Sequence, residues 1–277
     1  MKIGVRAHDF GGVSHTELVK LFLEKGVETT QLALQKAFAD FPPAMSNEAI
    51  EFVKNVKKSF EQSNISIAVL GCYINPVSDN HATLLSDIAK FKDNIEYARL
   101  LNAKLIGTET GSLNKDFSYN KYNHSKESYR KLISVLEPLL ELAQIKGVNI
   151  GIEAVCEFII HSPKTTQKLL KDLASSNLKI ILDPVNILNK KNFKNQLDVF
   201  EKAFFHYGDK IEVIHFKDFV MAKTKMEVPF GNGQFDWKGF LSIAKKYKSD
   251  CEIILESSAP TTFERTKDQI LQYLNTI

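Results

Sequence analysis

The stretch KIILDPVNIL, residues 179–188, begins like a buried β-strand and then reaches an acid. Ile180, Ile181 and Leu182 form a short apolar run, which is typical of a strand covered on both faces, and Asp183 follows at once. A carboxylate at such a place must contact water, pair with a positive charge or have a functional role, because an isolated buried charge is costly. The meaning of Asp183 therefore depends on whether it stands alone or belongs to a set.

Short runs of this kind recur along the chain and alternate with amphipathic segments, in which apolar residues recur every three or four positions. The clearest amphipathic segments are residues 46–63, 84–101 and 125–147. Ser46 and Ser125 stand at the expected N-caps of two of them, and Gly147 stands where the last should end. The eight predicted strands are residues 2–7, 29–34, 66–72, 104–110, 149–155, 179–184, 211–217 and 251–257.

Eight strands that each precede a helical segment, without a long structureless gap, predict an α/β fold. The layout is that of a (β/α)8 barrel of eight parallel strands, with residues 1–277 as a single domain. An open doubly wound sheet of eight strands is the alternative. The first strand speaks against that alternative, because KIGVRAHDFGG (2–12) lacks the G-x-G-x-x-G turn of a dinucleotide-binding fold.

The composition is that of an ordinary globular protein, with 277 residues, 44% hydrophobic and 25% charged. The formal net charge of +3 comes from 36 basic and 33 acidic residues mixed along the chain, so we expect no nucleic-acid partner. Cys72, Cys156 and Cys251 form no C-x-x-C pair, which argues against a disulfide framework and a thiolate metal site. Without an apolar leader or membrane-length run, we expect a cytoplasmic protein with no membrane partner.

The carboxyl-terminal ends of the strands form the active-site rim of a (β/α)8 barrel. The last four predicted strands carry there Glu153, Asp183, His215 and Glu256. The residues two positions earlier, on the same pleat faces, are Gly151, Ile181, Val213 and Ile254. If these faces point inward, the four polar side chains converge on the barrel axis.

Three carboxylates and an imidazole at bonding distance would repel and desolvate one another unless a cation lay between them. One divalent metal ion bound by Glu153, Asp183, His215 and Glu256 is therefore the simplest reading of the set. Oxygen donors with one nitrogen favour Mn²⁺, with Mg²⁺, Co²⁺ or Zn²⁺ as alternatives. Each residue alone has an ordinary role, as a helix cap, a loop charge or a hydrogen-bonded core histidine, but the set in matching phase favours the metal.

Six pieces of sequence together carry a resemblance to a known family. They are GTETG (107–111), IGIEAV (150–155), SSNLKIILDPVN (175–186), IHFKDF (214–219), VPFGNGQFDW (228–237) and IILES (253–257). In this order they resemble the sugar phosphate isomerase/epimerase group of the xylose-isomerase-like TIM barrels. The resemblance spans essentially the whole chain, and it is specific for the superfamily rather than for one substrate.

The resemblance implies that Glu153, Asp183, His215 and Glu256 bind one divalent metal ion. In the epimerases of this group, the glutamates at the places of Glu153 and Glu256 also exchange protons with the substrate carbon, one on each face of a cis-enediolate, while the metal holds the adjacent oxygens. A metal polarises the carbonyl and so makes the neighbouring C–H proton easier to remove. The expected activity is isomerisation or epimerisation of a ketose, sugar phosphate or related polyol ketone, with Glu153 and Glu256 as catalytic residues.

Two positions depart from the ketose 3-epimerases of this group. Those enzymes tend to have a histidine three residues after the aspartate of the sixth strand, where this chain has Asn186. They also tend to have an arginine six residues after the histidine of the seventh strand, where this chain has Met221. Both departures speak against a free ketohexose as substrate, while Asn186 remains a candidate to bind a substrate hydroxyl or to turn the loop after Pro184.

Other polar residues are candidates for substrate contacts. Lys217 is in phase with His215 and offers a cation, whereas Asp218 points the other way and suits a loop or helix cap. Glu109 is expected to bind a hydroxyl or to support the metal ligands. Arg6 and His8, on the first strand, suit a distal anionic group of the substrate, or else a salt bridge or surface position.

The segment KTKMEVPFGNGQFDW (223–237) is long for a connection between a strand and a helix. Gly231 and Gly233 allow it to turn, and Asp236 is a predicted N-cap for the helix that follows. We expect a loop that closes over the site, or else a mobile rim loop.

Three other functions stay open. A DNA-repair endonuclease of the same superfamily is disfavoured, because residues 216–236 contain no D-x-H pair and no basic stripe is present. A non-catalytic sugar-binding barrel has only the intact ligand set against it. An inosose-type dehydratase would use the same ligands, since it also begins by removing a proton next to a carbonyl.

By analogy alone, such barrels often pair through their helices, so a homodimer is one expectation for the assembly.

Overall fold

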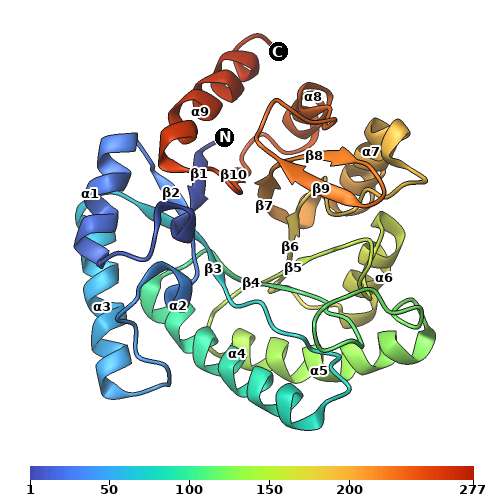
Figure 1. Cartoon of the computed structure of the whole chain (residues 1–277). Coiled ribbons are helices and arrows are strands. Elements are labelled where there is room, and N and C mark those ends of the chain that lie inside the picture. The colour runs from blue at the N-terminus through green and yellow to red at the C-terminus, as the bar shows by residue number, and fades with distance from the viewer.

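Eight parallel strands close into a barrel in the order β1-β10-β7-β6-β5-β4-β3-β2, as Figure 1 shows. The computed structural model describes all residues, 1–277. The ring closes where β1 pairs with β10, with Val5 opposite Leu255. The predicted (β/α)8 barrel is thus confirmed, and the open sheet is excluded. Its strands are β1 (Ile3–Arg6), β2 (Thr29–Leu32), β3 (Ser66–Gly71), β4 (Leu105–Glu109), β5 (Ile150–Glu153), β6 (Leu178–Leu182), β7 (Ile211–Phe216) and β10 (Glu252–Leu255).

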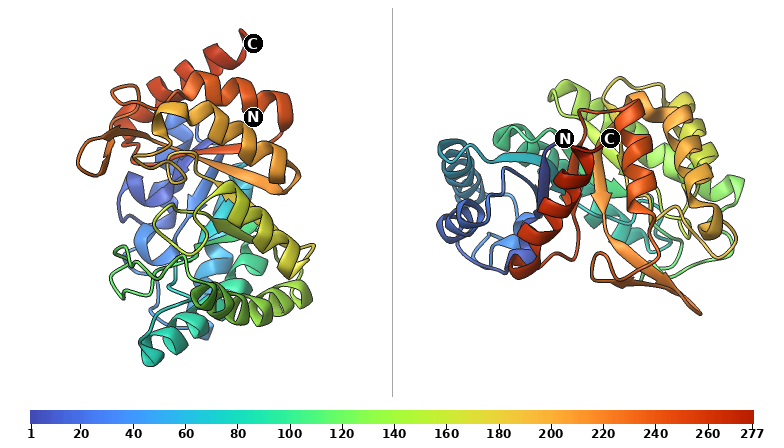
Figure 2. Two further views of the ribbon diagram at one scale, coloured as in Figure 1. Left: turned by 90° about the vertical axis from the view of Figure 1, so that its right-hand side faces the viewer. Right: turned by 90° about the horizontal axis from the view of Figure 1, so that it is seen from above.

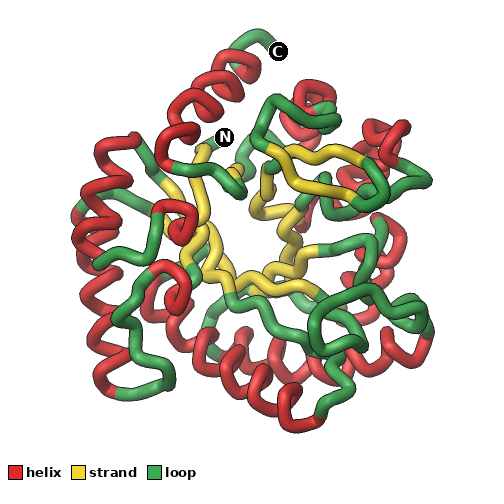
Figure 3. The backbone as a smooth tube through the Cα atoms, viewed as in Figure 1, coloured by secondary structure: helices red, strands yellow, loops and turns green.

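Helices surround this ring on the outside (Figure 3). Ser46 and Ser125 accept the backbone N–H groups of Ala49 and Ser128, as expected of N-caps. Gly147 has a left-handed φ of 68° just after the helix that it was predicted to end. No helix is long and apolar enough to span a membrane. The helices are α1 (His15–Lys25), α2 (Leu34–Ala37), α3 (Asn47–Gln62), α4 (His81–Leu101), α5 (Lys126–Ile145), α6 (Pro163–Leu173), α7 (Gln196–Tyr207), α8 (Trp237–Tyr247) and α9 (Pro260–Leu274).

The barrel separates two apolar cores. The larger one has 67 buried residues and fills the space between the strands and the helices. The smaller one has six residues enclosed by the strands, which are Ala68, Val69, Leu105, Ile181, Val213 and Ile254. Three of these precede Asp183, His215 and Glu256 by two positions, so those strand faces point inward as predicted. The inner core forms an apolar floor beneath the strand ends.

Gly151, which precedes Glu153 by two positions, also faces this floor. A Cβ atom at Gly151 would lie 2.8 Å from Leu105 Cδ1 and 3.0 Å from Ile181 Cγ1. The space that a side chain would need is therefore already filled by the inner core. Glycine at this position lets β5 pass close to its neighbours while Glu153 still points inward.

A β-hairpin begins just before the predicted loop, residues 223–237, and takes in its first part. Its strands, β8 (Asp218–Met221) and β9 (Lys225–Val228), pair antiparallel, and they project from the body of the barrel in Figure 2. The alternation of polar and apolar residues in KMEV suits a strand. This strand was not predicted, because the polar residues and glycines around it are typical of a loop. The expected loop is thus partly ordered, and only its distal part is irregular.

Asp218 holds the base of this hairpin. Its buried carboxylate accepts the backbone N–H groups of Gly231, Gly233 and Phe235, as well as that of Phe219. A Cβ atom at Gly233 would collide with this carboxylate, so only glycine fits there. Asp218 therefore acts as the loop acid that its phase indicated. Asp236 also caps α8 as predicted, by accepting the N–H of Gly239 at 2.9 Å.

Candidate functional site

Three side chains from neighbouring strands meet above the apolar floor. Glu153 ends β5, Asp183 directly follows β6, and His215 lies near the end of β7. Each offers one ligand atom within 4.8 Å of the other two, and all three residues are buried. His215 Nδ1 lies 3.1 Å from Glu153 Oε2. The structure thus brings together three of the four residues that strand phase placed on the barrel axis.

Several atoms of this group have no hydrogen-bond partner. Both ring nitrogens of His215 and Oδ2 of Asp183 are buried and make no well-aligned hydrogen bond, although Glu153 and Glu256 approach His215 Nδ1, and Lys217 approaches Asp183 Oδ2, to within 3.2 Å. The other oxygen of Asp183, Oδ1, accepts the backbone N–H groups of Val185 and Asn186 at 2.8 and 3.0 Å, which fixes the carboxylate. Unpartnered buried polar atoms are rare, and two carboxylates with an imidazole are good ligands for a divalent cation. The residues present therefore fit a metal ion.

Glu256 approaches the same group from β10 but is engaged by cations. Its Oε1 lies 3.2 Å from His215 Nδ1 and 3.5 Å from an Arg6 nitrogen. Its Oε2 accepts a hydrogen bond from Lys217 Nζ at 2.9 Å. Burial raises the pKa of Glu256, but the charges of Lys217, His215 and Arg6 outweigh it and lower this pKa to about 2. Glu256 is therefore ionised at neutral pH, beside the three-residue group rather than within it.

Lys217 lies between the acids. It was expected to offer its charge to the substrate, but it also contacts the carboxylates of the site. Its Nζ is 2.9 Å from Asp183 Oδ2 and 3.2 Å from Oε1 of Glu227, which reaches in from the hairpin. Burial lowers the pKa of Lys217, yet the charges of Asp183 and Glu256 raise it well above its usual value. Repulsion between the carboxylates predicted a metal ion as the charge that neutralises them. In the structure, Lys217 supplies part of that positive charge.

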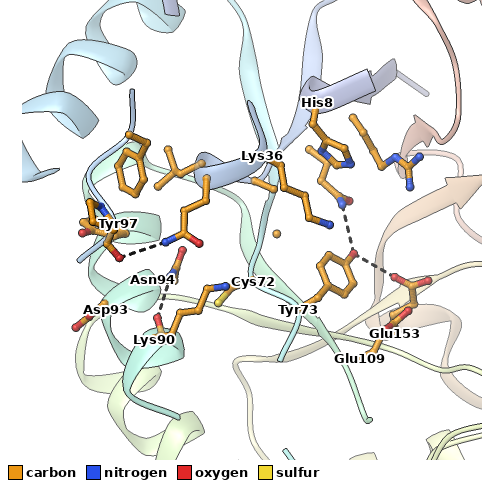
Figure 4. Close-up of a pocket in the computed structure, with 18 of the residues that line it drawn as sticks. His8, Lys36, Cys72, Tyr73, Lys90, Asp93, Asn94, Tyr97, Glu109 and Glu153 are labelled. Atoms are coloured by element: carbon orange, nitrogen blue, oxygen red, sulfur yellow. Dashed lines mark hydrogen bonds between the residues drawn. The ribbon is translucent and has the colours of Figure 1, made fainter. Parts of the chain in front are cut away.

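A cavity of about 640 Å³ opens above this cluster. Asp183 and His215 do not line it, whereas the other predicted site residues do, namely Arg6, His8, Glu109, Glu153, Asn186, Lys217 and Glu256. The cavity extends sideways past Tyr73 toward α2 and α4, as Figure 4 shows. It has a size typical of small-molecule sites.

The predicted substrate-binding residues differ in whether other side chains of the site already hold them. Asn186 donates a hydrogen bond from Nδ2 to Glu153 Oε1 at 2.5 Å, so it positions a carboxylate as well as lining the cavity. Arg6 is held by Asp9 at 3.1 Å and by Glu256. Burial and the charge of Glu153 raise the pKa of Glu109 to about 8, which leaves this carboxyl mostly protonated at neutral pH.

Tyr73 and Gln31 are site residues that the sequence analysis missed. Tyr73 donates a hydrogen bond from its hydroxyl to Glu153 Oε2 at 3.2 Å, and Gln31 Nε2 donates to the Tyr73 oxygen at 3.4 Å (Figure 4). A signal for Tyr73 was present, because it follows Val69 and Gly71 at the spacing of two that located the acids. Gln31 could have been noticed as a polar residue within the predicted strand 29–34.

The architecture resembles several solved structures along their whole length. A D-tagatose 3-epimerase-like protein is 19% identical with a TM-score of 0.78, and the match covers 100% of this chain and 98% of that one. A probable 3-DHS dehydratase from Bacillus anthracis is 17% identical with a TM-score of 0.75, covering 98% and 99%. A xylose isomerase-like TIM barrel protein from Mycobacterium smegmatis, in complex with magnesium, is 13% identical with a TM-score of 0.71, covering 99% and 97%.

At these identities the likeness establishes the fold alone. No curated protein matches the chain. The sequence model of the xylose isomerase-like TIM barrels matches residues 19–276, which is most of the chain. Together with the closed barrel and the cluster at its carboxyl-terminal strand ends, this match shows that the chain belongs to the xylose isomerase-like TIM barrel family.

Proposed function

We propose that this protein is a divalent-metal-dependent isomerase or epimerase. Its substrate is a ketose, a sugar phosphate or a related polyol ketone, on which it moves a proton at a carbon next to the carbonyl through an enediolate. The observation that carries the proposal is the buried group of Glu153, Asp183 and His215, whose ligand atoms converge where Glu153 lines a small-molecule cavity. The sugar epimerases among the structural neighbours agree with this activity.

Glu153, Asp183 and His215 would hold the metal, with Glu256 as a fourth ligand once it turns from its cationic partners. Mn²⁺ is the first expectation, since oxygen donors dominate, and Mg²⁺, Co²⁺ and Zn²⁺ are the alternatives. When bound, such an ion polarises a carbonyl and lowers the barrier to removal of the neighbouring proton. The charges of Glu153 and Glu256 raise the pKa of His215 despite its burial, so protons and metal compete for this imidazole.

Glu153 and Glu256 are the proposed proton carriers. They lie 3.1 and 3.2 Å from the same His215 nitrogen and come from β5 and β10, which β6 and β7 separate in the barrel. A substrate bound over His215 would therefore have a carboxylate on each side. Removal by one and return by the other inverts a carbon centre, and return to the adjacent carbon isomerises the sugar. Asn186 and Tyr73 orient Glu153 for this task by hydrogen bonds.

Dehydration is the second candidate, and Glu109 favours it. Elimination begins with the same proton removal but needs an acid to protonate the departing hydroxyl. The carboxyl of Glu109 lies in the cavity with a pKa raised to about 8 by burial and by Glu153, so it can supply that proton at neutral pH. A product lighter by one water would identify this reaction.

Metal content is the first test. Purified protein, analysed by inductively coupled plasma mass spectrometry, should contain or take up about one equivalent of Mn, Co, Zn or Mg. Asp183→Asn and Glu256→Gln should each lower the affinity for the metal at least about tenfold. Glu252→Gln is the matched control, because Glu252 lies at the other end of β10 and pairs with Lys104 instead.

Proton exchange then tests the reaction. The metal-loaded protein is incubated with ketoses, ketose phosphates and inososes in deuterated water, and the incorporation of deuterium at carbon is followed. Incorporation of deuterium into a product whose mass otherwise equals that of the substrate supports the isomerase or epimerase. Protein that neither retains nor regains metal would overturn the proposal and leave a non-catalytic sugar-binding barrel as the explanation of the cavity.

A further inference from the structure

The cavity has a second end that the proposed chemistry does not use. This distal arm is the part between α2 and α4, lined by Lys36, Lys90, Asp93, Asn94 and Tyr97. In Figure 4 it lies on the far side of Tyr73 from Glu153. Lys36 extends toward Tyr73 from α2, and Lys90 extends toward Cys72 from α4. The two ammonium groups therefore enter one space from two different elements.

Neither lysine has an acidic partner. No carboxylate lies within 4.0 Å of Lys36 Nζ or Lys90 Nζ, whereas Lys217 contacts three. Asp93 is the only acid of the arm, so the arm has a net positive charge. Unpaired cations in the wall of a cavity attract an anionic ligand group, and lysine is a common phosphate binder.

Two residues that line the cavity each have a buried polar atom without a partner. Tyr97 is 3% exposed, and its hydroxyl has no hydrogen-bond partner. Gln31 is 2% exposed, and its Oε1 has none, although its Nε2 is used by Tyr73. Tyr97 lines the arm, while Gln31 lines the cavity beside Tyr73, to which its Nε2 donates a hydrogen bond. Burying such atoms is costly unless a ligand or water satisfies them, and sugar hydroxyls are suitable partners.

We propose that the distal arm binds the phosphomonoester end of an acyclic sugar substrate, with Lys36 and Lys90 at the phosphate. Tyr97 and Gln31 contact the hydroxyls between the phosphate and the reacting carbons. This inference rests on the proposed function, because it places the carbonyl end of the same substrate above Glu153 and His215. It names the substrate class as ketose phosphates rather than free ketoses.

Calorimetric titration of two matched pairs tests the arm. The ligands are D-fructose 6-phosphate with D-fructose and D-ribulose 5-phosphate with D-ribulose, and inorganic phosphate serves as the probe for the arm alone. We expect the phosphorylated member to bind at least about tenfold more tightly in the parent, with or without metal. Lys36→Gln and Lys90→Gln should each weaken that preference several-fold, and the double variant should abolish it.

Lys92→Gln is the matched control, because Lys92 is exposed on α4, two residues from Lys90, and does not line the cavity. It should keep the full preference. Equal binding of phosphorylated and free ketoses in the parent, or a preference that survives in the double variant, would overturn the inference. Circular dichroism shows whether each variant is folded before its titration is interpreted.

The two proposals fail in different ways. If no ligand exchanges a proton but the lysine-dependent preference for phosphates is present, the proposed reaction is wrong and the arm stands. If free ketoses exchange protons and the double variant leaves their KM and kcat unchanged, with no preference for phosphates, the reaction stands and the arm is wrong.

Discussion

The two ends of the cavity differ in charge, in burial and in the elements that supply them. At one end, Glu153 is buried and Glu256 half-buried, and both come from strand ends and lie within 3.2 Å of His215. At the other end, Lys36 and Lys90 come from helices, are exposed, and pair with no acid. The acidic end sits on a packed apolar floor, whereas the basic end is open to water.

This difference separates chemistry from recognition. A buried carboxylate on a rigid strand is held at one place, which suits proton transfer over a short distance. An exposed lysine on a helix attracts charge over a longer distance and adapts to its ligand. We therefore expect changes at the acidic end to alter the rate of the reaction, and changes at the basic end to alter which ligand is bound.

The largest effect is expected for Glu153→Gln. This variant removes the proposed base, so proton exchange should fall about 10²- to 10⁴-fold in kcat, while D-fructose 6-phosphate binds within about threefold of the parent. Lys36→Gln should do the reverse, with a higher KM and a smaller change in kcat. Deuterium incorporation and calorimetry, with metal content measured beside them, distinguish the two. Exchange above a tenth of the parent rate in Glu153→Gln would remove Glu153 from the chemistry.

A smaller effect is expected for Glu109→Gln, measured as the stability of metal-free protein against pH. Burial and Glu153 raise the pKa of Glu109 to about 8, above the value of about 4.3 for an unfolded glutamate. The folded state thus binds more protons between these two values, and the parent loses stability as pH rises through that window.

Glu109→Gln should remove this loss. At pH 8 the variant should be more stable than the parent by on the order of 1 to 2 kcal/mol, since cavity water screens part of the charge, and near pH 4 the two should be equal. Urea unfolding at several pH values measures the difference. Glu141→Gln, at an exposed position of α5 without an ion pair, is the control and should follow the parent. A gain that does not grow with pH would contradict this account of Glu109.

The smallest effect is expected for Tyr73→Phe. The change deletes one hydrogen bond to Glu153, of 3.2 Å, and leaves the ring in place. Proton exchange should fall about tenfold, which matches the contribution of one such bond, with metal content unchanged. Tyr119→Phe is the control, because Tyr119 is 57% exposed outside the cavity. A loss of metal in Tyr73→Phe would mean that the tyrosine supports the ligands rather than the reaction.

The acidic end could be predicted from the sequence because a strand has a period of two. Counting from Ile181, Val213 and Ile254 placed Asp183, His215 and Glu256 on the inward faces, and the inner core confirms those faces. The same count would have found Tyr73 from Val69 and Gly71. The number of strands and their alternation with helices likewise predicted the barrel, since the hydrophobic pattern is local.

The sequence by itself thus determined the barrel, its inward faces and the residues at its strand ends. Only the tertiary structure decided that Lys217 lies against Asp183 and Glu256, that a hairpin brings Glu227 to it, and that α2 and α4 place two lysines in one cavity. The physical reason is that a strand fixes the direction of its own side chains through its local period. The place of a helix or a long side chain over the site depends on packing between segments far apart in the chain, and no local pattern records that packing.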